Sequence, residues 1–131
     1  MLTSWTMNGP QPTLPRTLAR LIAGLGIAVD AALFVFKAPG AFTLTTHLFA
    51  LWLMLPWIVV LVIAWRGDPP GLLPGTLLAA AFEAVAFHGT FIAPKGSTAA
   101  LIYAVKPVWQ VGLLLAAIVI GLLLRHARRR Q

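Results

Sequence analysis

The sequence predicts an all-α integral membrane protein, a four-helix bundle made of two consecutive helical hairpins with both termini in the cytoplasm. Hydrophobic residues make up 60% of the 131 residues and charged residues only 10%, with a mean hydropathy of +0.89. A soluble domain carries about 25% charged residues, so this composition indicates lipid as the solvent. Four long apolar stretches alternate with short segments rich in proline and glycine, which are typical of turns.

The four predicted spans cover residues 16–37, 42–65, 72–92 and 97–124, and a basic tail follows at 125–131. Each span reaches the ~20 residues that are needed to cross a bilayer core. Residues 38–40 and 94–96 contain Pro and Gly and predict tight turns, whereas 66–71 is a longer polar loop. Residues 1–131 are therefore expected to form one transmembrane domain.

The basic residues predict the orientation of these spans. Positively charged residues flanking transmembrane segments favour the cytoplasmic side, which places both termini and the 66–71 loop there, in a bacterial inner membrane. The tail arginines are also expected to contact anionic lipid headgroups, at ~1 kcal/mol each. Seven arginines lie on the predicted inner side and two lysines on the outer side: Arg16, Arg20, Arg66, Arg125, Arg128, Arg129 and Arg130 against Lys37 and Lys95.

Ionisable side chains within the spans form the candidate site, because a charge in lipid costs about 3 kcal/mol and usually has a function. Residues equally distant from the turn of an antiparallel hairpin lie at the same height. This symmetry pairs Asp30 with His47, and Glu83 with Lys106 a few ångströms deeper. His88 lies nearer the outer end. All five lie in the half of the bundle away from the arginines, which predicts a polar cluster in the outer half.

Stripes of small residues predict that both acids point into the bundle. Asp30 continues a stripe of Ala19, Ala23 and Gly26, and Glu83 continues a stripe of Thr76, Ala79 and Ala80. Small residues at three- and four-residue spacing mark helix–helix interfaces in membranes. Tyr103, Lys106 and Gln110 share one face of the fourth span. The complete predicted cluster, binding or structural, is Asp30, His47, Glu83, His88, Tyr103, Lys106 and Gln110.

The sequence offers no pattern typical of catalysis, of a metal site or of a cofactor. There is no cysteine. Glu83 and His88 are five residues apart and therefore about 140° apart around a helix, which does not suit a shared metal. No nucleophile elbow or phosphate-binding loop is present. We therefore expect no catalytic residue, metal or cofactor, and no nucleic acid among the partners.

Three functions fit a membrane domain with so little mass outside the bilayer. The sequence favours an accessory or interaction component that binds a larger membrane protein or a second copy of itself. The alternative is a small oligomeric transporter or channel that uses Glu83 and Lys106. A membrane enzyme with an outer-facing pocket is the third. The buried pairs themselves fit either ligand binding or a structural role in fixing helix register.

Overall fold

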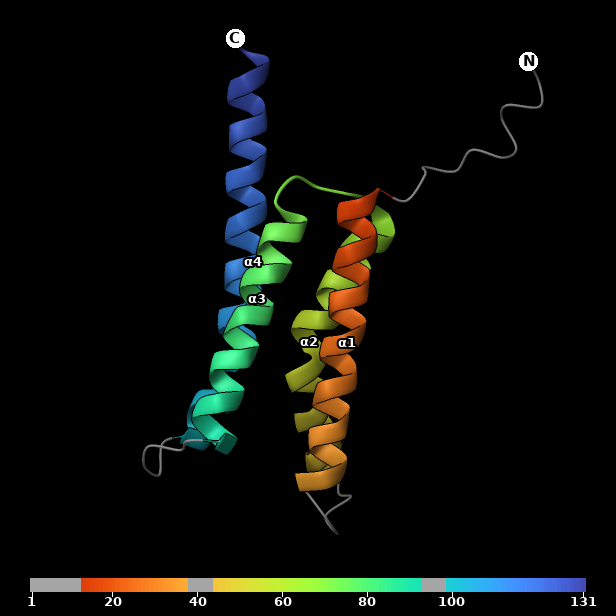
Figure 1. Ribbon diagram of the computed structural model, residues 1–131, viewed down its shortest axis with the longest axis vertical. Coiled ribbons are helices and arrows are strands. Elements are labelled where there is room, and N and C mark those ends of the chain that lie inside the picture. The colour runs from red at the N-terminus through yellow and green to blue at the C-terminus, as the bar shows by residue number, and fades with distance from the viewer. Residues whose placement is uncertain (1–12, 38–43, 93–98) are drawn as a thin grey trace, which may run out of the picture.

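The computed structural model describes residues 13–37, 44–92 and 99–131, and its regular structure over these residues is entirely helical (Figure 1). The predicted all-α, four-helix architecture is thus confirmed. Four helical segments are long and apolar enough to cross a membrane. The elements are α1 (Leu14–Lys37), α2 (Leu44–Arg66), α3 (Leu72–Phe87), the π-helical segment η2 (His88–Ile92) that continues α3, and α4 (Ala99–Arg129).

The predicted boundaries at 16, 37, 65, 72 and 92 lie within two residues of the ends of these elements. The predicted starts at 42 and 97 and the predicted turns at 38–40 and 94–96 lie outside the described residues. The sequence predicted that the fourth span ends at residue 124, whereas α4 continues to Arg129. Residues 125–129 contain no helix breaker, and arginines near a helix C-terminus interact favourably with its macrodipole. Most of the expected basic tail is therefore a continuation of the fourth helix.

Two antiparallel hairpins lie side by side (Figure 1). α1 packs against α2 and α3, and α4 packs against α3 and α2, so α1 and α4 occupy opposite corners of the bundle. The start of α1, the 67–71 loop and the end of α4 lie at one end, as the hairpin prediction requires. Trp52 of α2 adds a bond between the hairpins, because its indole N–H donates to the carbonyl of Ala104 on α4 at 2.8 Å.

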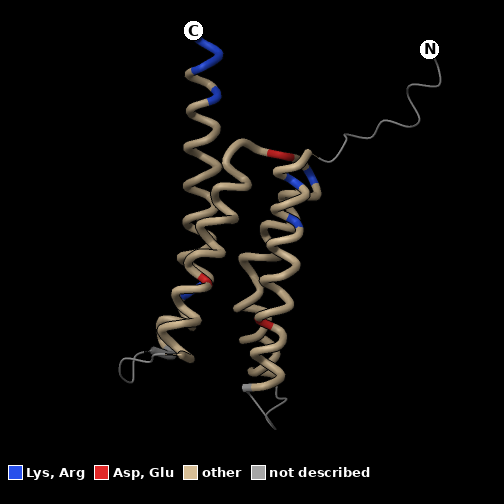
Figure 2. The backbone as a smooth tube through the Cα atoms, viewed as in Figure 1, with Lys and Arg blue, Asp and Glu red and all other residues tan. Residues whose placement is uncertain are grey.

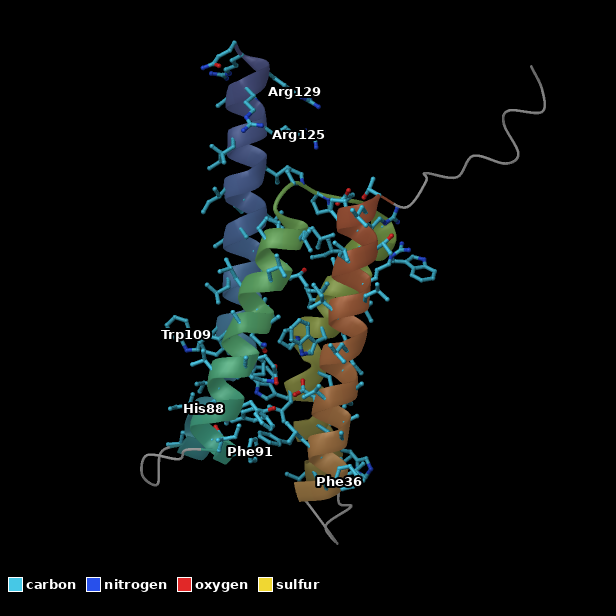
Figure 3. All side chains as sticks on the ribbon, in the orientation of Figure 1. Phe36, His88, Phe91, Trp109, Arg125 and Arg129 are labelled. Atoms are coloured by element: carbon cyan, nitrogen blue, oxygen red, sulfur yellow. The ribbon has the colours of Figure 1, made fainter. Side chains whose placement is uncertain are left out.

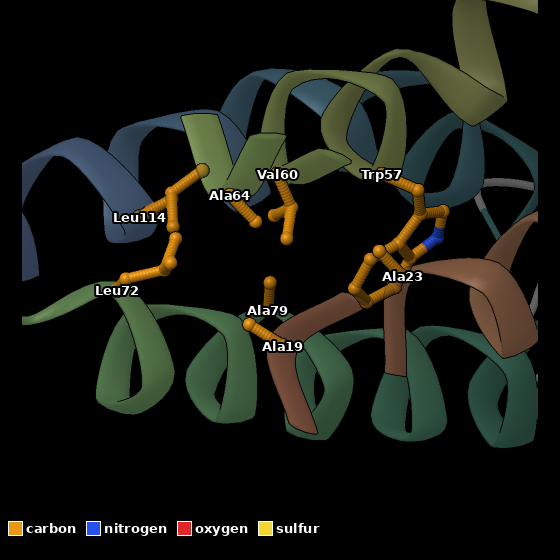
Figure 4. Close-up of a cluster of buried hydrophobic side chains, with 8 residues drawn as sticks. All are labelled: Ala19, Ala23, Trp57, Val60, Ala64, Leu72, Ala79 and Leu114. Carbon is orange, nitrogen blue, oxygen red and sulfur yellow. The ribbon is translucent and has the colours of Figure 1, made fainter. Parts of the chain in front are cut away.

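The core combines four alanines with larger apolar side chains, of which Trp57 is the largest. The indole of Trp57 is 1% exposed, and a Cβ atom added to Gly26 of α1 would lie only 2.3 Å from it. The predicted small stripe on α1 is therefore an interface, and its glycine makes room for the tryptophan. The cluster shown in Figure 4 consists of Ala19, Ala23, Trp57, Val60, Ala64, Leu72, Ala79 and Leu114.

A glycine at the start of α3 allows the loop between the two hairpins to pack against α4. Gly71 has φ +89°, a conformation that side chains disfavour, and a Cβ atom there would lie 2.2 Å from the carbonyl oxygen of Ala117. Gly121 meets the loop in the same way, since its Cβ would lie 2.6 Å from the Pro70 carbonyl. Glycine on both sides allows the loop backbone to lie directly against α4.

Candidate functional site

The structure brings five of the seven predicted site residues into one buried cluster between the hairpins. Asp30 comes from α1, Glu83 from α3, and Tyr103, Lys106 and Gln110 from successive turns of one face of α4. The acidic positions within α1 and α3 lie in the half of the bundle away from the arginine-rich end (Figure 2). The cluster therefore joins three helices.

The ammonium group of Lys106 lies between two carboxylates. Its Nζ is 2.5 Å from Oε2 of Glu83, and 3.1 and 3.4 Å from the two carboxylate oxygens of Asp30. The side chains of Lys106 and Asp30 are fully shielded, whereas that of Glu83 is 10% exposed. Removing one partner from such a group leaves an uncompensated charge in the bundle, so the ammonium is what allows both acids to be buried.

The hydroxyl of Tyr103 lies between the same two carboxylates. Its oxygen is 3.1 Å from Oδ1 of Asp30 and 3.1 Å from Oε1 of Glu83. A phenol has one proton and donates to one acceptor at a time. Either the two acids share this proton in a bifurcated bond, or one carboxyl carries a proton of its own and donates it to the tyrosine oxygen. The geometry thus has a place for one proton between the acids.

Gln110 completes the cluster on the side of the arginine-rich end. Its amide nitrogen donates to Oε2 of Glu83 at 2.9 Å and to the backbone carbonyl of Ala79 at 3.0 Å. Its amide oxygen is buried and has no hydrogen-bond partner among the described residues. An amide oxygen accepts hydrogen bonds only, so it leaves one acceptor for a donor group or water.

The charges of the cluster do not balance. Two carboxylates share one ammonium, so the formal charge is −1 when both acids are ionised. In a low-dielectric bundle an unbalanced charge is costly, and a bound proton or cation neutralises it. The arrangement is chemically suited to holding a positive species, and it offers no exposed nucleophile.

The two predicted histidines lie outside this cluster. The sequence paired Asp30 with His47, whereas in the structure Asp30 bonds to Lys106 and Tyr103. The His47 side chain is exposed, and its ring lies 6.0 Å from the Phe34 ring. Symmetry about a turn fixes the height of a residue but not the helix that it faces. Asp30 faces across the bundle instead of toward its hairpin partner. His88 is exposed at the start of η2 (Figure 3).

No group of three metal-ligating side chains occurs within the described ranges 13–37, 44–92 and 99–131. The tail arginines lie exposed at the end of α4, where Figure 3 labels Arg125 and Arg129. Arg125 and Arg128 also line a concave surface beside Pro70. Contact with lipid headgroups there stays a prediction.

An arginine clamp at the other end of the bundle was missed by the sequence analysis, which took Arg16 and Arg20 as signals of orientation only. Arg16 is buried and donates to the carbonyls of Ala64 and Trp65, the latter at 2.5 Å, at the end of α2. Arg20 donates to Ala64 at 2.9 Å and lies 5.2 Å from the Trp65 ring. The last carbonyls of a helix lack intrahelical hydrogen-bond donors, and the two arginine side chains donate the missing hydrogen bonds here. Arginines one turn apart at the start of a span, opposite the end of its hairpin partner, were the available signal.

Comparison with protein-family models, with curated proteins and with solved structures finds no match for this chain.

Proposed function

We propose that this chain is an accessory component of a membrane assembly, which binds a partner protein through the exposed C-terminal part of α4. The observation that carries the proposal is the α4 arm, defined as residues 122–131. The helix is 31 residues long, or about 46 Å, well beyond the ~20 residues that a bilayer core requires. Every residue of the arm is exposed.

The composition of the arm supports a docking role. Leu122, Leu123 and Leu124 are 47–64% exposed and precede the arginines. These leucines continue α4 and can pack against an apolar surface that a partner places beside them. An apolar turn followed by a basic turn suits a partner helix that presents apolar residues and then acidic ones.

The buried cluster has a structural part in this proposal. It connects α1 with α3 and α4 and so holds the two hairpins in one register. A rigid bundle keeps the arm at a fixed angle to the membrane, which lowers the entropy lost when a partner binds.

Photo-crosslinking in the native membrane tests the proposal. A photoreactive amino acid at Leu123 should give one discrete protein adduct, whereas the same group at Leu115, exposed on α4 within the bundle, should give lipid adducts only. Replacing Arg125, Arg128 and Arg129 by Gln should remove the protein adduct. Lipid adducts alone at both positions would show that the arm contacts headgroups and not a protein.

A small oligomeric carrier is the second candidate, and the unbalanced charge of the cluster favours it. A carboxylate that exchanges a proton for a cation is a simple way to couple the two. Protein reconstituted into liposomes should then take up a cationic substrate in exchange for protons that leave the liposome. Glu83→Gln should abolish this uptake without changing the elution volume of the protein in size-exclusion chromatography. Uptake equal to that of empty liposomes across a panel of cations would exclude this candidate.

A further inference from the structure

A groove between α1 and α3 leads from the lipid-facing surface to the buried cluster. It has a volume of about 560 Å³, which is sufficient for a small organic molecule. Leu25 on one side is 66% exposed and Ala84 on the other is also exposed, so the groove opens toward lipid. Gly26, Trp57, Glu83 and Phe87 also line it.

Glu83 is the member of the cluster that reaches this groove. It lines the groove and keeps 10% of its side chain exposed, whereas Lys106 and Asp30 are fully shielded. Its Oε2 accepts from Lys106 and Gln110, and its Oε1 is bonded to Tyr103. A carboxylate has about four acceptor positions, so one position on Oε1 is left for a further donor.

Trp57 supplies a second, independent indication of a ligand. Trp57 is a lining residue of the groove, and its indole Nε1–H, which lies beside Gly26, is buried without a hydrogen-bond partner among the described residues. The absence of a side chain at Gly26 leaves this edge of the indole close to the α1 backbone. An unpaired buried donor is costly, so an acceptor brought by a ligand would be favourable here.

We propose that this groove binds a hydrophobic protonated amine that also carries a hydroxyl group. The ammonium pairs with the Glu83 carboxylate and balances the excess negative charge of the cluster. The hydroxyl oxygen accepts from the Trp57 indole, and the apolar part fills the groove. Gly26 and Asp30 are one helical turn apart on α1, so the indole and the acids are separated by about 6 Å along the bundle, within reach of an amino alcohol.

The apolar lining alone would suit a lipid acyl chain. An acyl chain supplies neither a positive charge nor a hydrogen-bond acceptor at this depth. It would therefore leave the negative charge at Glu83 unbalanced and the Trp57 N–H without an acceptor. The site does not depend on the accessory role. The carrier candidate requires, in addition, that the bound amine is transported. Binding of the amine without uptake would therefore support the site and exclude the carrier.

Binding of propranolol, a fluorescent hydrophobic amino alcohol, to the full chain in phosphatidylcholine nanodiscs tests the proposal. Equilibrium dialysis against empty nanodiscs should show saturable binding at one site per chain. The N-acetyl analogue, which keeps the hydroxyl but has no charge, should bind at least ~10-fold more weakly, which corresponds to about 1.4 kcal/mol. Partitioning equal to that of empty nanodiscs, or equal binding of the two compounds, would overturn the site.

Two matched variants at positions outside the cluster, Ala84 and Val85, locate the site. Ala84→Phe fills the groove and should weaken binding at least ~10-fold, whereas Val85→Phe, at a neighbouring position that is 71% exposed and does not line the groove, should leave binding unchanged. Glu83→Gln should weaken binding similarly. Equal affinities of the Ala84 and Val85 variants would refute the location. Equal affinity of the deoxy analogue of propranolol would refute the role given to the Trp57 N–H.

Discussion

Lys106 is the residue on which the buried cluster depends, because two carboxylates share its ammonium. Lys106→Met keeps most of the side-chain volume but leaves both acids without a cation. We expect the free energy of unfolding to fall by about 3–5 kcal/mol, the usual effect of removing one partner from a buried ionic group. Unfolding by sodium dodecyl sulfate in mixed micelles, followed by circular dichroism, measures this loss.

The control for this prediction removes all the charges together. Because nearly isosteric neutral residues leave no unpaired charge, the triple variant Asp30→Asn, Glu83→Gln, Lys106→Met should lie within about 1 kcal/mol of the natural protein. A triple variant as unstable as Lys106→Met alone would show that the charges attract one another enough to stabilise the fold.

Tyr103 gives a second test at the residue scale. Tyr103→Phe keeps the ring that packs 5.3 Å from Phe91 but removes the hydroxyl that lies 3.1 Å from both carboxylates. We expect a loss of about 1–3 kcal/mol in the same unfolding assay, since a buried acceptor then lacks its donor. Phe91→Leu, which disturbs the ring contact and not the hydrogen bonds, is the comparison. A Tyr103→Phe variant as stable as the natural protein would show that the tyrosine hydroxyl does not stabilise the cluster.

At the scale of the elements, the two glycines of α1 differ in what surrounds them. A Cβ atom at Gly26 would overlap the indole of Trp57, whereas one at Gly24 would meet nothing within 4 Å. Gly26→Ala should therefore lower the free energy of unfolding by about 1–3 kcal/mol, as overpacking of a core usually does. Gly24→Ala should leave it unchanged or slightly raised, because alanine favours the helix.

The same pair of variants reports on the groove. A displaced Trp57 changes its surroundings, so the tryptophan fluorescence of Gly26→Ala should differ from that of Gly24→Ala. Equal stabilities and equal spectra would show that α1 moves away from α2 without cost.

For the whole molecule, the sequence was sufficient to predict the four helices, but not how the residues of the cluster are connected. Span positions follow from hydropathy and from breakers such as Gly71, which are local signals. The Glu83–Lys106 contact follows from symmetry within one hairpin. The partner of Asp30 does not, because it lies on the other hairpin, and the packing of one hairpin against the other is decided by shape.

That shape depends on contacts too specific for a pattern to show. The fit of Trp57 over Gly26 and of the Pro70 carbonyl against Gly121 sets how the hairpins meet. The clamp at Arg16 was overlooked for a different reason, since an arginine at the start of a span is usually taken only as a sign of orientation. Five residues of the site were therefore predictable by type, while most of their partners required the packed structure.

The helices span in either direction equally well, so the side of the membrane that each end of the molecule faces is tested separately. We expect both ends and the 67–71 loop in the cytoplasm, because seven arginines lie at that end. The chain has no cysteine, so single-cysteine variants give a signal without background. In intact bacterial cells a membrane-impermeant maleimide should label Ser97→Cys, and should label Gly67→Cys and Gln131→Cys only after permeabilisation.

The opposite pattern would invert the molecule and place its buried cluster in the cytoplasmic half of the bilayer. The result also bears on the ligand groove. Because the groove lies beside Glu83, the labelled side determines which leaflet supplies a hydrophobic amine. In the expected orientation, an amine that is confined to the outer leaflet should reach Glu83 without crossing the bilayer, and binding to intact cells should need no permeabilisation. Labelling of Gly67→Cys in intact cells would contradict both expectations together.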